Sequence, residues 1–251
     1  MKNNPAARLH AILMLAKEQK GSTPTIIAWK NILDLQTDED LEIMGMVGKV
    51  FTLPLAVTYA VNQIPALHQE LYLSWKSGIE NAFRANTWNG NIQEFLKHIN
   101  DTMLVSLQFV SDNLGRLAPE ITLNEKNFEE LRQGAWNLYE EISNSDMDSI
   151  VKDYLLKHMS MILRALDDYP ILGIQPLNTA IETCIGTVVT QEAKAKNSND
   201  TKAGSDFWKF TAKILVALKI AQSTVNLGND AVQFLQKCGI LDESESSVSD
   251  H

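Results

Sequence analysis

The sequence predicts an all-α fold: a multi-helix bundle of about eight or nine mostly antiparallel helices, ending in a C-terminal helix or helical hairpin after a polar linker. Three observations predict it. Apolar residues recur three and four positions apart, which places them on one face of a helix. No comparable stretch alternates apolar and polar residues as a half-buried strand does. Prolines and capping residues separate the helical stretches by short loops, which favours antiparallel neighbours.

Capping residues indicate the first helix boundaries. Thr23 followed by Pro24 predicts an N-cap and a proline at the first helical position. Asp38 precedes the stretch EDLEIMG, whose acids are expected in the first turn of a long helix that starts at about Asp38, where the helix dipole favours negative charge. We expect that helix to continue to Ile64 and to be kinked or split at Pro54, since proline has no N–H to donate.

A turn and three helix faces follow. The segment 88–91, Trp-Asn-Gly-Asn, predicts the turn. Each face repeats at helical spacing, so its residues are candidates for the core. The faces comprise Ile92, Phe95, Ile99, Met103, Leu107, Val110, Leu114 and Leu117; then Phe128, Leu131, Ala135, Leu138 and Ile142; then Val151, Leu155, Met159, Ile162 and Leu166.

The helices of the second half also have expected ends. Asn124 is placed to cap the helix that begins EKNFEEL, and Asp146 or Asp148 to cap the next. That next helix is expected to end at Pro170, because the residue before a proline disfavours helical backbone. Pro176 is expected in the first turn of another helix.

Composition along the chain predicts four segments. They are a helical body over 1–195, with a second boundary considered near 88–91, a flexible linker over 196–205, a C-terminal helical segment over 206–239 and a disordered acidic tail over 240–251. The linker and the tail are poor in large apolar residues, so neither is expected to pack into a core.

Charge and cysteine content limit the classes of partner and compartment. The net charge of −9 argues against nucleic acid as a partner, because phosphate binding needs clustered Lys and Arg. Cys184 and Cys238 lie outside any CxxC or Cys/His pattern, so we expect two reduced, buried thiols. The apolar run 11–16 is short for a signal peptide. We therefore expect a cytoplasmic protein of bacterial origin.

The sequence predicts no catalytic, cofactor-binding or metal-ligating residue and no cofactor. The stretch Gly45–Val50 resembles a phosphate-binding loop, but Ile43 stands where a glycine is needed and Val50 where Ser or Thr is needed. Its glycines are interpreted as allowing close helix packing. The five histidines lack partners at zinc or di-iron spacing and are interpreted as surface or satisfied core residues.

The tryptophans provide one candidate for partner binding. Trp29 and Trp75 lie among apolar residues at helical spacing and are expected in the core. Trp88 lies in the predicted turn, where an exposed ring could anchor a partner, although packing over the loop is the commoner outcome.

The segment 206–239 provides the second candidate, an apolar face covering more than half of a helix circumference. A membrane span is not expected, because Lys213 and Lys219 bracket only a short apolar run. Gly228 leaves one long helix and a hairpin both open. The face therefore needs a protein surface, on this chain, a partner or a second copy. The candidate partner-binding residues are Phe207, Phe210, Ile214, Leu218, Ala221, Val225, Val232 and Leu235.

Three segments carry a resemblance to a known group. NPAARLHAILMLAKEQKGSTPTIIAWKNIL, HQELYLSWKSGIE and YLLKHMSMILRALDDYPILG resemble a group of uncharacterised all-helical bacterial proteins, over residues 4–185. The resemblance implies an all-helical fold and suggests an accessory role in mobile or antiviral-defence loci. It implies no activity and no functional residue.

Three functions remain open at this stage. The first is a non-catalytic interaction protein, an adaptor or accessory subunit that binds a protein partner or itself. The second is a membrane-acting effector that uses its C-terminal segment on a lipid surface. The third is an enzyme of unrecognised type, whose site would be assembled from distant residues. We favour the first, because residue patterns for catalysis are missing.

Overall fold

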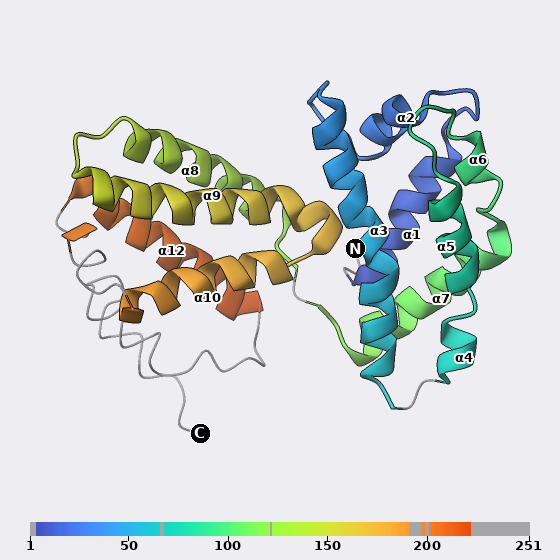
Figure 1. Cartoon of the computed structure of the whole chain (residues 1–251). Coiled ribbons are helices and arrows are strands. Elements are labelled where there is room, and N and C mark those ends of the chain that lie inside the picture. Colours follow the sequence, from blue (N-terminus) through green and yellow to red (C-terminus); the bar gives the residue numbers. More distant parts are fainter. Residues whose placement is uncertain (1–3, 66–67, 121, 191–196, 199–200, 222–251) are drawn as a thin grey trace. The chain divides into compact units, whose positions relative to one another are not determined.

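The computed structural model confirms the all-α fold (Figure 1). It describes residues 4–65, 68–120, 122–190, 197–198 and 201–221. Within these residues nine helices have eight or more residues, and the one β-type contact is an isolated bridge between Pro24 and Asn91.

The chain forms two compact units, each with its own core. Unit 1 comprises Met1–Glu120 together with Pro170–Gly173, and unit 2 comprises Ile121–Tyr169 and Ile174–His251. The sequence does not predict this division, which depends on contacts between residues far apart in the chain. The predicted segment borders at 195/196 and 239/240 lie at or within residues that the structure does not describe, so they stay predictions.

Unit 1 is built around α1, which packs against α7, α3 and α2. Trp29 and Trp75 are fully or almost fully buried, as predicted. The Trp29 indole N–H donates to Asn86 Oδ1 at 2.8 Å, and its ring lies edge-on to Phe95. The helices are α1 (Pro5–Lys17), α2 (Thr25–Ile32), α3 (Asp40–Asn62), α4 (Gln69–Tyr72), α5 (Lys76–Ala85), α6 (Gln93–Leu96) and α7 (Asp101–Leu117).

Unit 2 contains α8 (Glu125–Ser143), most of α9 (Ser149–Leu172), α10 (Gln175–Thr190) and α12 (Lys202–Ala221). Figure 1 shows α8 and α9 side by side, and a short loop joins them, so they are antiparallel. The predicted faces 131–142 and 151–166 are buried in this core, with Phe128 packed against it. Asn124 and Asp148 accept hydrogen bonds from the first turns of α8 and α9, as predicted.

The helix starts in unit 1 differ in detail from the prediction. Pro24, not Thr23, is the N-cap of α2, and it offers no side-chain cap. The helix α3 begins at Asp40, two residues after the expected start, and Asp40 and Glu42 stand in its first turn, as predicted. Asp38 lies before the helix and pairs with Lys30.

Pro54 does not split α3, which continues through it. The proline removes one N–H donor from the helix, but Pro54 and its neighbour Leu53 are buried in the core, and this packing stabilises the helix there.

The predicted face from Ile92 to Leu117 belongs to two helices. The first, α6, ends at Leu96, and Asn100 caps the second, α7, because its side chain accepts from the Met103 N–H. Leu117, in the last turn, is 53% exposed and lies outside the core.

The C-terminal end of α9 also differs. The helix passes the predicted stop at Pro170 and ends at Leu172, where Gly173 adopts φ +74°, a conformation that glycine tolerates. Arg8 of α1 binds this end: its Nε donates to the Ile171 carbonyl at 2.9 Å, and its Nη1 pairs with Glu120 at 2.6 Å. These contacts assign the last turn of α9 to unit 1.

Candidate interaction surface

The predicted partner-binding face of α12 packs inside unit 2. Phe207 and Ile214 are fully buried, and Leu218 is 2% exposed. Phe210 is partly buried and lies over Gly134 of α8, where an added Cβ would come within 3.0 Å of its ring. The side chain of Ala221 and the residues Val225, Val232 and Leu235 lie outside what the structure describes.

The helix α12 is buried on two sides because it packs against both α8 and α10. Trp208 and Leu215, which lie outside the predicted face, are also buried, and the Trp208 indole donates to Ser198 Oγ at 2.9 Å. The helix begins at Lys202, before the predicted start at Asp206. The residues of the predicted face that the structure describes therefore pack in the core of unit 2.

Trp88, the other candidate for partner binding, lies in the predicted turn but is not an exposed ring. Its ring is partly buried and packs on the core of unit 1. The predicted turn is present, with the Gly90 N–H donating to the Thr87 carbonyl at 3.3 Å. Packing over the loop, the commoner outcome, is what the structure shows.

The helix α3 has an inner face that forms part of the core of unit 1. Its buried residues recur at helical spacing and pack with residues of the other unit-1 helices. They are Ile43, Val47, Val50, Leu53, Pro54, Val57 and Val61.

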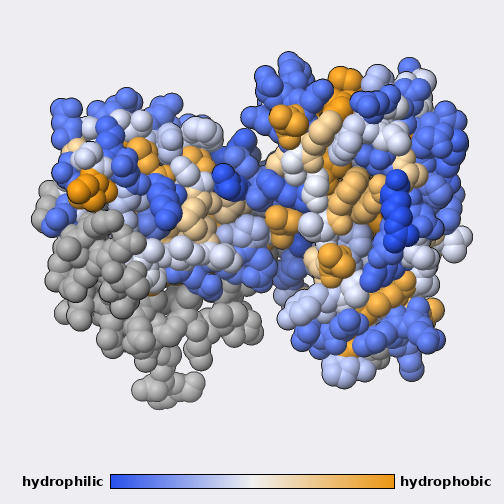
Figure 2. Space-filling view, viewed as in Figure 1, coloured by the Kyte–Doolittle hydropathy of each residue, from blue (hydrophilic) through white to orange (hydrophobic). Residues whose placement is uncertain are grey.

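The opposite side of α3 is apolar as well and remains exposed. Leu41 is 82% exposed, Leu55 64% and Tyr59 69%. Figure 2 shows orange and near-white residues along the course that α3 takes in Figure 1. The residues lie within one ~100° arc of the helix. We name this set the α3 outer face: Leu41, Gly45, Gly48, Thr52, Leu55, Ala56 and Tyr59.

The glycines of this face do not serve close packing within the unit. Nothing lies within 4 Å of the position that a Cβ would take at Gly45 or Gly48. Among the described residues, no other helix of this chain packs against these two glycines, so the interpretation that they allow close helix packing is not borne out within the unit. The missed signal was the 4-3-4-3-4 spacing of uncharged residues from Leu41 to Tyr59.

Because both of its faces are apolar, α3 is the one described helix long and apolar enough to cross a membrane by length and composition. The core helix of a soluble protein passes the same test, and a third of the most apolar window is buried. Crossing a bilayer would require the inner face to leave α1, α2, α5 and α7, so the buried contacts oppose it.

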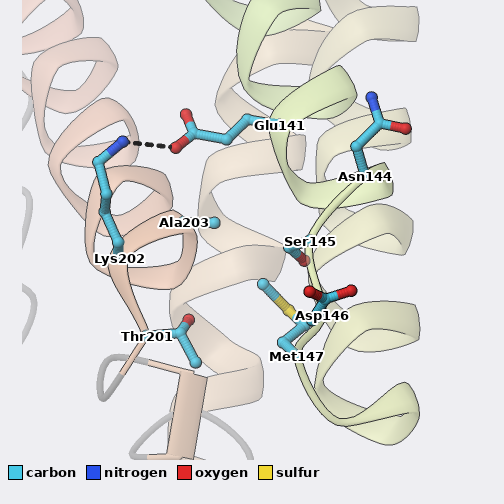
Figure 3. Close-up of a pocket in the computed structure, with 8 residues that line it drawn as sticks. All are labelled: Glu141, Asn144, Ser145, Asp146, Met147, Thr201, Lys202 and Ala203. Atoms are coloured by element: carbon cyan, nitrogen blue, oxygen red, sulfur yellow. Dashed lines mark hydrogen bonds and ion pairs between the residues drawn. The ribbon is translucent and has the colours of Figure 1, made fainter.

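A recess of about 600 Å³ lies at the end of α8 and the start of α12 (Figure 3). Glu141 pairs with Lys202 across it at 2.9 Å, and hydrogen bonding to this carboxylate raises the pKa of Lys202. Figure 3 shows Asn144, Ser145 and Asp146 along one side and Thr201 at the start of α12. The recess therefore presents one ion pair and dispersed polar groups.

The core of unit 2 contains a buried polar cluster. His158 Nδ1 lies 2.7 Å from the Tyr154 carbonyl, which can only accept, so Nδ1 carries a hydrogen. Burial lowers the pKa of His158. The Thr187 hydroxyl lies 3.0 Å from His158 Nε2 and donates to the Cys184 carbonyl at 2.8 Å. Tyr154 Oη also lies 3.1 Å from that hydroxyl. His158 is a satisfied core residue, which confirms its interpretation.

Among the described residues, no three His, Cys, Asp or Glu side chains gather as a metal site would require. Cys184 is a free, buried cysteine, as expected, and burial raises the pKa of its thiol to about 12. Cys238 lies outside the described residues.

No protein-family model matches the chain. Searches of curated proteins and of solved structures found no significant match either.

Proposed function

We propose that the protein is a non-catalytic interaction protein that binds a protein surface through the α3 outer face. The observation that carries this proposal is the exposure of Leu41, Leu55 and Tyr59 on one uncharged face. Contiguous apolar surface costs free energy in water, so faces of this kind mark sites of protein or membrane contact. A mixed face of large side chains and glycines fits a packed helix, because the glycines leave space for a partner's side chains.

The chemistry of the ends of α3 supports a protein partner over nucleic acid. Asp38, Glu39, Asp40 and Glu42 are exposed around its N-terminus, and Lys49 is the one basic residue of the helix. A phosphate backbone would be repelled there. With the net charge of −9, this favours a partner that is apolar where it meets the centre of α3.

The cellular setting of the proposal rests on the sequence alone. We retain a cytoplasmic bacterial protein with an adaptor or accessory role, and antiviral defence as the suggested context. The genes that neighbour its own would test that context, since accessory genes of defence loci lie beside the effectors they serve.

Site-specific photo-crosslinking in the cells that produce the protein tests the proposed function. A benzophenone amino acid would replace Leu55 on the α3 outer face. The matched control carries it at Val105 of α7, which is 68% exposed and off that face. We expect a crosslinked protein of defined mass from position 55 and none of that mass from position 105.

A second variant shows whether the crosslink reports binding. Gly48→Glu adds a charge into open space on the same face, so it leaves the fold intact and should abolish the crosslink from position 55. Equal crosslinking at both positions, or crosslinks to lipid alone, would contradict the proposal. The lipid outcome would favour the membrane-acting alternative.

A further inference from the structure

The α3 outer face is complementary to itself in shape. Its N-terminal half presents Gly45 and Gly48 with open space above them. Its C-terminal half presents Leu55 and Tyr59, both largely exposed. If two copies of α3 lie antiparallel and cross at Thr52, the large side chains of each copy lie opposite the glycines of the other. Large residues facing small ones allow two helices to interdigitate without voids.

The charges at the ends of α3 favour the same direction. Exposed carboxylates surround its N-terminus, whereas Asn62 and Gln63 at its C-terminus are uncharged. A parallel pair would bring two acidic ends together, and like charges at close range repel. An antiparallel pair places each acidic end beside the partner's uncharged end.

We propose that a second copy of this chain occupies the α3 outer face, antiparallel, about a two-fold axis at Thr52. This inference rests on the proposed function of that face in protein contact. The same surface of both copies is used, so the contact closes on itself and yields a dimer, not a filament. Thr52 suits the axis because it is small, exposed and uncharged, with its hydroxyl already donating to the Lys49 carbonyl.

The size of the face indicates a weak dimer. From Leu41 to Tyr59 it extends ~27 Å at ~1.5 Å per residue, with a helix width of ~10 Å. That footprint is well below the ~800 Å² per partner of a standard stable interface. We therefore expect a weak, transient dimer.

Sedimentation velocity on the purified full chain, from about 1 to 500 µM, measures this association directly. We expect concentration-dependent dimers. Leu55→Glu should weaken the dimer by about tenfold or more, since it places an unpaired charge in the contact. Val105→Glu is the control, because it makes the same kind of change on an equally exposed residue of α7. Circular dichroism confirms that both variants are folded.

Thiol crosslinking tests the register. In a Cys238→Ser background, Thr52→Cys places two thiols together at the axis, where a disulfide requires Cα atoms within ~7 Å. Leu41→Cys places them ~33 Å apart in the same pair, from twice eleven residues at ~1.5 Å. Cys184 does not interfere, since it is fully buried and its thiol pKa is raised to about 12.

We expect Thr52→Cys to form an interchain disulfide under mild oxidation far faster than Leu41→Cys. A chain that stays monomeric to the highest concentration would overturn the inference. So would a dimer that ignores Leu55→Glu, or equal disulfide rates at the two positions. If the purified chain is monomeric while position 55 crosslinks a different protein in cells, the proposed function stands and the second copy is excluded.

Discussion

Replacing Phe207 by alanine tests whether α12 belongs to the core of unit 2 or is free to bind a partner. The ring is fully buried, lying edge-on to Trp208 with centroids 4.9 Å apart and to His158 at 6.4 Å. Removing a buried phenylalanine ring leaves a cavity and costs about 3–5 kcal/mol of unfolding free energy.

That loss is measurable by calorimetry. The size of unit 2 lies between that of small and large domains, so its transition should lose about 3–5 °C of Tm per kcal/mol, and Phe207→Ala should lower that Tm by about 9–25 °C. If the two units unfold separately, the transition of unit 1 should not move.

The matched control is Val216→Ala in the same helix. Val216 is 37% exposed and points away from the core, so its truncation should change stability by less than about 1 kcal/mol. If Phe207→Ala also costs less than this, α12 is not docked. The face predicted from the sequence would then be free to bind a partner.

Three further outcomes follow from single groups. Gly173→Ala should destabilise unit 1, because an added Cβ would lie 2.6 Å from the Arg8 guanidinium and φ +74° strains alanine; a Tm equal to that of the wild type would contradict this. Burial lowers the pKa of His158, so the unfolded chain binds its proton first and stability falls as pH drops below 6.5. His158→Gln should reduce this loss between pH 7.5 and 5.5 in urea titrations more than His10→Gln, at a less buried site. Cys184 should resist thiol reagents at neutral pH until the chain unfolds, since its pKa is about 12.

The sequence predicted those parts of the fold that depend on local spacing. The faces from Leu131 to Ile142 and from Val151 to Leu166 are buried because a 3–4 repeat defines one side of a helix whatever it packs against. The cap at Asn124 also follows from the residue itself. The stop at Pro170 was wrong because a contact distant in sequence, from Arg8, binds the last turn of α9.

The candidate site was harder to predict, because it depends on how many neighbours each helix has. Local spacing revealed the broad apolar face of 206–239 but not that α12 contacts two helices. It also revealed Gly45 and Gly48, yet their direction is set by which side of α3 enters the core. The 4-3-4-3-4 spacing from Leu41 to Tyr59 marks one side of the helix, but whether that side is exposed depends on which side of α3 packs into the core.

A helix that is apolar around most of its circumference has two outcomes in a folded chain. Neighbours bury both sides, as with α12, or one side stays in water, as with α3. The two cases respond oppositely to mutation. Phe207→Ala should lower stability, whereas Leu55→Glu replaces a 64% exposed residue and should change stability by less than about 0.5 kcal/mol while weakening association. Finding both effects in one Leu55→Glu protein would mean that the α3 outer face supports the fold of unit 1, and the case for an interface there would fail.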